Sequence, residues 1–155
     1  MNKALLVIDL QRKYIDKVYG EDVVFAANSV IGENLDNTVV YIKNISKYKF
    51  RNKGTELADN LNVVSEHIFT KQAGDAFTNP ELKQFLDSRQ IDTVEIIGVD
   101  GGACVVMTAV GAVNNGYKVI VNTQAIATRP LLEKRRDIYF AKLKFMGAEI
   151  RLGEK

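Results

Sequence analysis

Cys104 is the only cysteine in the 155-residue chain, and its position indicates chemistry as well as packing. An apolar run ends in the glycine-rich segment 98–103 directly before it, which is the pattern of a strand that turns into a helix. A thiol in the first turn of a helix faces unpaired backbone N–H groups and the positive end of the helix dipole, and both favour thiolate over thiol. The competing interpretation is a buried core residue, because free cysteine is among the most buried residue types.

Two other reactive side chains follow strand-like runs. Asp9 comes directly after the apolar run 4–8, and Lys71 follows the run 67–69. In an open parallel sheet the ligand site lies beyond the carboxyl ends of the strands, so we expect Asp9, Lys71 and Cys104 to meet at one edge. A carboxylate can take and return protons, an ammonium can stabilise anions, and a thiolate can attack a carbonyl carbon. Taken singly, Asp9 also fits a helix cap and Lys71 a solvated surface residue.

The elements that must position these residues alternate along the chain. Apolar runs predict strands over 4–8, 38–42, 67–69, 94–97 and 118–121, and the alternating segment 148–152 predicts an edge strand. Helices are predicted over 22–35, 80–88, 102–115 and 130–146, with Pro80 and Pro130 in first turns. This order predicts an α/β fold, a three-layer doubly wound and mainly parallel sheet of about six strands.

Composition and charge exclude several classes of protein. Twenty-one basic and nineteen acidic residues give a net charge of +2, which indicates neither nucleic acid nor a membrane as a partner. The length fits one domain over 1–155, and a single cysteine excludes an intrachain disulfide. The first apolar run is too short for a signal peptide or a membrane span. We therefore expect a single-domain cytoplasmic protein.

Three segments in combination resemble the isochorismatase-like family of cysteine hydrolases, which includes nicotinamidases and other amide hydrolases. They are Ala-Leu-Leu-Val-Ile-Asp-Leu-Gln over 4–11, Thr-Lys-Gln-Ala-Gly-Asp-Ala-Phe over 70–77, and the nucleophile strand, turn and helix from 98 onward. The resemblance spans roughly residues 4–128 and implies a Rossmann-like, isochorismatase-type fold. It also implies a catalytic triad of Asp9, Lys71 and Cys104, a cis peptide between Val99 and Asp100, and a homo-oligomer.

The chemistry implied by this resemblance is hydrolysis of the C–N bond of a small amide through a thioester. Asp9 would take the thiol proton, Lys71 would lower the thiol pKa, and the backbone N–H groups of Asp100 and Cys104 would hold the oxyanion.

Position alone makes Gln11, Tyr14 and Phe77 candidate substrate-binding residues. Phe77 fits a core aromatic equally well. His67 lies in a predicted strand, so a packed histidine is favoured over a partner for the cysteine.

Departures from the family pattern bear on metal binding and substrate. Nicotinamidases of this family carry Asp-x-His and a further His as metal ligands after the second strand, and the corresponding region here has no histidine. We therefore expect no metal and no cofactor, with a small-molecule substrate whose identity stays open. The segment Gly101-Gly102-Ala103 also replaces the polar and aromatic residues often found in the turn.

Two rival functions remain open at this stage. One is a catalytically silent member of the same fold that only binds a ligand, because fold does not determine function. The other is a vinyl-ether hydrolase in which Asp9 acts as general acid and Cys104 is dispensable. A nucleotide site is disfavoured, since the spacing of the glycines matches neither dinucleotide nor phosphate-loop patterns.

Overall fold

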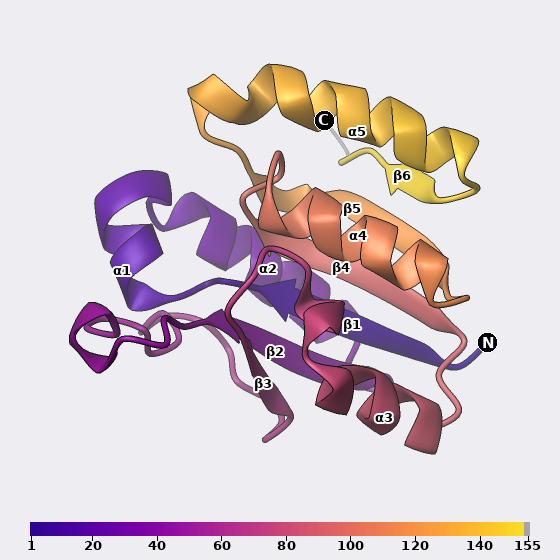
Figure 1. Cartoon of the computed structure of the whole chain (residues 1–155), viewed down its shortest axis with the longest axis horizontal. Helices are drawn as coiled ribbons and strands as arrows, with labels where there is room; N and C mark the ends of the chain where they lie inside the picture. Colours follow the sequence, from indigo (N-terminus) through magenta and orange to yellow (C-terminus); the bar gives the residue numbers. More distant parts are fainter. Residues whose placement is uncertain (154–155) are drawn as a thin grey trace.

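The computed structural model describes residues 1–153 and has a six-stranded sheet in the order β3-β2-β1-β4-β5-β6 (Figure 1). Every pairing within the sheet is parallel. The strands are β1 (Lys3–Ile8), β2 (Thr38–Asn44), β3 (Ile68–Lys71), β4 (Thr93–Val99), β5 (Lys118–Ala127) and β6 (Glu149–Arg151). Strands β1 and β4 are almost wholly buried, as their nearly continuous apolar sequences favour in a sheet covered on both faces. The predicted α/β fold is confirmed.

Helices cover both faces of the sheet and complete three layers. Helices α3 (Pro80–Ser88), α4 (Cys104–Asn114) and α5 (Glu133–Phe145) pack on one face, and α2 (Asp22–Glu33) packs on the other (Figure 1). The short α1 (Arg12–Tyr14) continues into a π-helical turn, Ile15–Tyr19, which the sequence did not predict. Helix α3 begins as predicted, with Pro80 in its first turn. The structure adds an N-cap, in which the side chain of Asn79 accepts from the backbone N–H of Glu81.

The first five strands are each longer than the sequence predicts, β5 most of all. Strand β3 continues to Lys71, and β5 continues through polar residues to Ala127. The pairing of β4 with β5 shifts register between Ile96 and Gly98, so β5 carries extra residues at that point. The Asn122 side chain compensates there, because it donates to Glu95 and accepts from the backbone N–H of Gln124. Satisfied polar groups of this kind allow a strand to pass through a sequence with no apolar pattern.

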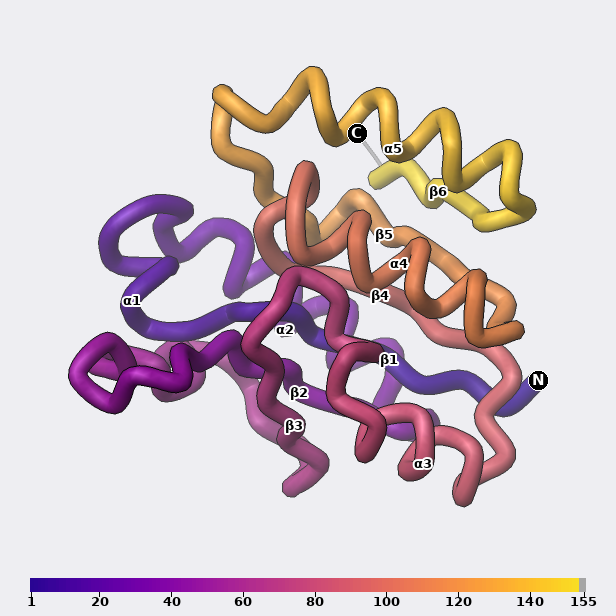
Figure 2. The backbone as a smooth tube through the Cα atoms, viewed as in Figure 1, coloured from indigo at the N-terminus to yellow at the C-terminus, as the bar shows by residue number. Residues whose placement is uncertain are grey.

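The carboxyl ends of β1, β2 and β3 open onto the same edge of the molecule. There α1 lies beside the loop that follows β2, and the two are joined by backbone hydrogen bonds from Arg12 to Glu56 and from Lys13 to Gly54 (Figure 2). Asp9 leaves β1 with a φ of 55°, a left-handed conformation that aspartate tolerates better than most residues. That turn directs the chain out of the sheet immediately after its last buried strand residue.

Helix α5 is held mainly by one side of its surface. Leu143 is fully buried, and Tyr139 and Phe140 are partly buried against the core. Ile138 and Phe145, on the same helix, are exposed at 63% and 94%. Homo-oligomer formation stays a prediction.

In residues 1–153, no helix combines the length and the apolar character that crossing a membrane requires.

Gly98 allows β4 to approach β1 closely, which generates a stability prediction. Its φ is 121°, and a Cβ at this position would overlap the backbone carbonyl oxygen of Ile8. We expect Gly98→Ala to lower the free energy of unfolding by roughly 2–4 kcal/mol, measured by urea denaturation followed by circular dichroism.

Gly32 provides the matched control, because it lies in α2 and a Cβ at this position would meet no atom within 4 Å outside its own stretch of helix. Gly32→Ala should raise the free energy of unfolding by about 0.5 kcal/mol through helix propensity. Equal effects of the two substitutions would contradict the close approach at Gly98.

Candidate active site

Cys104 is the first residue of α4, directly after the turn that follows β4. The prediction that it lies in the first turn of a helix is therefore confirmed, although the helix begins two residues later than the predicted range 102–115. The peptide bond between Val99 and Asp100 is cis, as the family resemblance implied. The turn is closed by Asp100, whose carbonyl oxygen accepts from Val105 and whose carboxylate accepts from the N–H of Gly102 at 2.8 Å.

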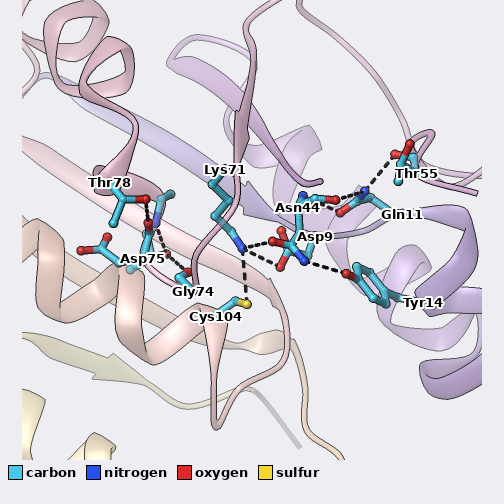
Figure 3. Close-up of polar contacts among 12 residues, drawn as sticks. Asp9, Gln11, Tyr14, Asn44, Thr55, Lys71, Gly74, Asp75, Thr78 and Cys104 are labelled. Atoms are coloured by element: carbon cyan, nitrogen blue, oxygen red, sulfur yellow. Dashed lines mark hydrogen bonds and ion pairs between the residues drawn. The ribbon is translucent and has the colours of Figure 1, made fainter. Parts of the chain in front are cut away.

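Lys71 lies at the centre of the polar cluster (Figure 3). Its ammonium group contacts three acceptors: Asp9 Oδ2 at 3.1 Å, Asn44 Oδ1 at 3.3 Å and Cys104 Sγ at 3.4 Å. The Lys71 side chain is fully buried, so these partners replace the water that a lysine normally keeps. The structure thus brings the three predicted residues Asp9, Lys71 and Cys104 together at one edge of the sheet.

The Asp9 carboxylate is buried and only half paired. Oδ2 accepts from Lys71, whereas Oδ1 has no hydrogen-bond partner within residues 1–153. Burial raises the pKa of the Asp9 carboxyl, and the charge of Lys71 partly opposes that rise. A buried carboxylate with a free oxygen and a raised pKa is suited to accept a proton.

The thiol of Cys104 is less acidic than the sequence predicted. Burial is the largest effect and the negative charge of Asp9 the next, and together they raise the pKa of Cys104 to about 11. Lys71 acts in the predicted direction, lowering the pKa, but it is outweighed. The resting side chain is therefore a neutral thiol, and it needs a base to become a nucleophile.

The backbone near the thiol presents free donors. Among the hydrogen bonds of residues 1–153, none is donated by the backbone N–H of Asp100 or by that of Cys104. Cys104 is the first residue of α4, where backbone N–H groups lack intrahelical acceptors. These two N–H groups are the ones expected to face an oxyanion.

A cavity of about 280 Å³ opens beside the thiol. Asp9 and Cys104 line it together with Asp100, and Tyr14, Tyr19, Asn44 and Arg129 contribute polar groups to its wall. The volume lies near the lower end of ligand pockets, which favours a small molecule.

The Asp100 carboxylate ties together three segments of the cavity wall. Its Oδ2 accepts from the Tyr19 hydroxyl at 2.8 Å, from the Arg129 backbone N–H at 2.9 Å and from Arg129 Nε at 3.1 Å. Burial and the hydrogen bond to Asp100 raise the pKa of Tyr19, so its hydroxyl stays protonated. Both oxygens of the buried Asp100 carboxylate thus accept hydrogen bonds, and these bonds hold the cavity wall together.

The three predicted substrate-binding residues lie in different places. Tyr14 lines the cavity. Gln11 is fully buried, and its carboxamide bonds to backbone groups of Asn44 and Thr55 instead of facing the cavity. Phe77 packs against Tyr117, with ring centroids 5.7 Å apart, in the core under α4.

His67 precedes β3, at the opposite end of that strand from Lys71. Its ring packs on Phe85 with the centroids 4.7 Å apart, and burial lowers the pKa of its imidazole. This is the packed histidine that the sequence favoured.

Sequence reasoning missed Asn44, Tyr19 and Arg129. Asn44 ends β2, which is the same strand-end position that identified Asp9 and Lys71, so a correct strand boundary would have found it. Tyr19 and Arg129 reach the site from segments whose position depends on the π-helical turn and on the extended β5.

As for metal binding, no group of three or more His, Cys, Asp or Glu side chains is placed to hold a metal ion among residues 1–153.

The opposing effects of Asp9 and Lys71 on the thiol generate a prediction. Iodoacetamide should modify Cys104 slowly at about pH 8, with a rate that rises about tenfold per pH unit, because only the thiolate reacts. Lys71→Met should slow the reaction by about tenfold, and Asp9→Asn should accelerate it, since each removes one charge beside the sulfur. Mass spectrometry identifies the modified residue. A wild-type rate that already reaches its plateau below about pH 8 would contradict the raised pKa.

Comparisons with known proteins identify relatives in sequence and in fold. A chain from Bacillus subtilis (strain 168), the uncharacterized isochorismatase family protein YrdC, is 27% identical over 151 residues, covering 90% of this chain and 81% of the relative. The solved structure of N-carbamoylsarcosine amidase from Thermoplasma acidophilum matches with a TM-score of 0.81 and 25% identity, covering 100% of this chain and 98% of that one.

The nicotinamidase SaPncA from Staphylococcus aureus shares the fold, with a TM-score of 0.78 and 24% identity over 97% of this chain and 99% of that one. The family model of the Isochorismatase domain matches residues 3–152. This match covers nearly the whole chain, and the protein accordingly belongs to the isochorismatase family of hydrolases.

Proposed function

We propose that this protein is a metal-independent cysteine hydrolase that cleaves the C–N bond of a small amide through a thioester. The observation that carries the proposal is the contact of Lys71 Nζ with both Asp9 Oδ2 and Cys104 Sγ, at 3.1 and 3.4 Å. An acid, a cation and a thiol in mutual contact beside a cavity supply a base, charge stabilisation and a nucleophile.

In the first half of the proposed reaction, Asp9 Oδ1 accepts the thiol proton as Cys104 Sγ attacks the amide carbon. A carbon–sulfur bond forms, and the carbonyl oxygen becomes an oxyanion held by the N–H groups of Asp100 and Cys104. The raised pKa of Asp9 narrows the gap to the thiol pKa of about 11, which makes the proton transfer less unfavourable. Asp9 then returns the proton to the departing nitrogen, the C–N bond breaks, and ammonia or an amine leaves.

In the second half, water attacks the thioester carbon while Asp9 accepts a proton from it. The carbon–sulfur bond breaks, the acid product leaves, and the proton on Asp9 returns to the sulfur. The Lys71 ammonium stabilises whichever neighbour is anionic at each stage. Because Lys71 is fully buried behind Asp9 and Cys104, its role is electrostatic and does not include direct substrate binding.

The substrate class is proposed from the cavity and from the relatives together. About 280 Å³ admits a small amide, and the matched solved structures include an N-carbamoylsarcosine amidase and a nicotinamidase. A panel containing N-carbamoylsarcosine, nicotinamide and other small amides, assayed by release of ammonia, identifies the preferred substrate. Incubation with a chelator beforehand should leave the rate unchanged, and a rate restored only by added zinc or iron would contradict metal independence.

With a substrate from this panel, we expect Cys104→Ala and Cys104→Ser each to lower kcat/KM by at least about 10³-fold, because alanine has no nucleophile and a serine hydroxyl is far less acidic than a thiol. Hydroxylamine should trap the wild-type thioester as a hydroxamate and should trap nothing from either variant. Circular dichroism checks that both variants fold. Vinyl-ether hydrolysis that survives Cys104→Ala would favour the acid-catalysed alternative, and ligand binding without turnover would favour the binding-only alternative.

The buried carboxylate also predicts a pH dependence. Asp9 must be ionised to accept the thiol proton, so kcat/KM should fall as the pH decreases through its folded-state pKa, which burial raises above the ordinary value of 3.8. Lys71→Met should shift this acidic limb to higher pH, because the cation that favours the ionised form is lost. The pH profile of kcat/KM measures both shifts, and an acidic limb that stays in place in Lys71→Met would contradict the coupling.

A further inference from the structure

Gln11 acts on the end of β2 instead of on a substrate. Its Oε1 accepts from the Asn44 backbone N–H at 2.8 Å, and its Nε2 donates to the Asn44 carbonyl oxygen at 3.0 Å. The same Nε2 donates to the carbonyl oxygen of Thr55 at 2.9 Å. One buried carboxamide therefore pairs with both backbone polar groups of Asn44 and holds this residue in a defined place.

The Asn44 side chain connects the triad with the cavity wall (Figure 3). Asn44 lies opposite Lys71 in the register of β2 and β3, and its Oδ1 accepts from the Lys71 ammonium at 3.3 Å. Its Nδ2 donates to the Tyr14 hydroxyl oxygen at 2.8 Å. Lys71 has only donors, so the amide oxygen must face it and the NH₂ group must face Tyr14.

This orientation has a consequence for Tyr14. Its hydroxyl oxygen accepts the Asn44 hydrogen bond, so its own proton is available to another acceptor. Tyr14 lines the cavity beside Cys104, where that acceptor would be a substrate atom.

Among the three acceptors around Lys71, Asn44 alone does not change its protonation state in the proposed reaction. Asp9 and Cys104 exchange a proton, so the strengths of their contacts with the ammonium alternate through the cycle. The contact with Asn44 is constant, and the backbone of Asn44 is held by Gln11.

We propose that Asn44 is a positioning residue, which holds the Lys71 ammonium between Asp9 and Cys104 and orients the Tyr14 hydroxyl as a donor to the substrate. This inference rests on the proposed cysteine hydrolase function, but its first test needs no substrate.

The first test is the alkylation rate of Cys104 by iodoacetamide. The charged groups that act on the thiol are Asp9 beyond β1 and Lys71 on β3. The other titratable or charged groups of the surrounding cavity wall are Tyr14, Tyr19, Asp100 and Arg129. Asn44→Leu removes the acceptor that holds the ammonium in place, so we expect the ammonium to move away from the sulfur. The cation then stabilises the thiolate less, and the alkylation rate at about pH 8 should fall about tenfold. Asn44→Ala removes the same acceptor with a smaller side chain and serves as the second variant if Asn44→Leu does not fold.

Asn122→Leu is the matched control. Asn122 is also a buried asparagine of the same sheet, and its side chain donates to Glu95, away from the cavity. This variant should lose stability in urea denaturation and keep the wild-type alkylation rate to within about twofold. Wild-type alkylation rates in folded Asn44→Leu or Asn44→Ala would overturn the proposal.

The second test separates kcat from KM with the substrate found in the screen. Tyr14→Phe should raise KM and leave kcat nearly unchanged, because it removes a binding contact that persists through the reaction. Asn44→Leu should lower kcat by roughly 10²-fold through displacement of Lys71, and Tyr14→Phe should have little further effect in that background. If the fold-changes of Tyr14→Phe and Asn44→Leu simply multiply in the double variant, the connection of Tyr14 to Lys71 through Asn44 would be overturned.

The two proposals can fail separately. If Cys104→Ala remains active, the cysteine hydrolase function is wrong, whatever Asn44 does to the thiol. If Cys104→Ala is inactive while Asn44→Leu keeps wild-type alkylation and wild-type kcat, the function stands and the role of Asn44 is wrong.

Discussion

The fully buried ammonium of Lys71 is the constraint on which the rest of the site depends. A lysine cation removed from water is costly unless each of its donors has an acceptor. Here the acceptors come from the end of β1, the end of β2 and the first residue of α4, with the lysine itself ending β3. These four segments are far apart in the sequence, and a parallel sheet with its carboxyl ends at one edge brings them together. The parallel sheet that buries Lys71 therefore also supplies the acceptors that its ammonium group needs.

A second buried carboxylate, that of Asp100, organises part of the cavity wall. The Asp100 carboxylate accepts hydrogen bonds from Gly102, Tyr19 and Arg129, and so joins the nucleophile turn to two distant segments. Asp9 and Asp100 differ in how fully they are paired. Every polar atom of the Asp100 side chain has a partner, which suits a structural role, whereas Asp9 keeps a free oxygen beside the thiol within residues 1–153, which suits proton transfer.

The sequence was sufficient for the fold class, for most elements and for the meeting of Asp9, Lys71 and Cys104, because apolar runs and strand ends carry those signals. It was insufficient for β5, whose polar residues 122–124 interrupt the apolar pattern and are satisfied only by tertiary hydrogen bonds. Gln11 was assigned to the substrate by its position, although only the folded loop shows that backbone groups occupy its carboxamide. The acidity of the thiol was misjudged for a related reason, since burial and the charge of Asp9 depend on packing.

The neutral state of the Cys104 thiol has a consequence for the durability of the protein. Peroxides and other oxidants react with thiolates far faster than with thiols, so a cysteine with a pKa of about 11 is almost entirely in its unreactive form near neutral pH. Cysteines with low pKa values gain a larger fraction of thiolate at the cost of steady oxidative loss. In the proposed mechanism the sulfur is deprotonated only when a carbonyl carbon is in place, which would combine reactivity toward substrate with resistance to oxidation between turnovers.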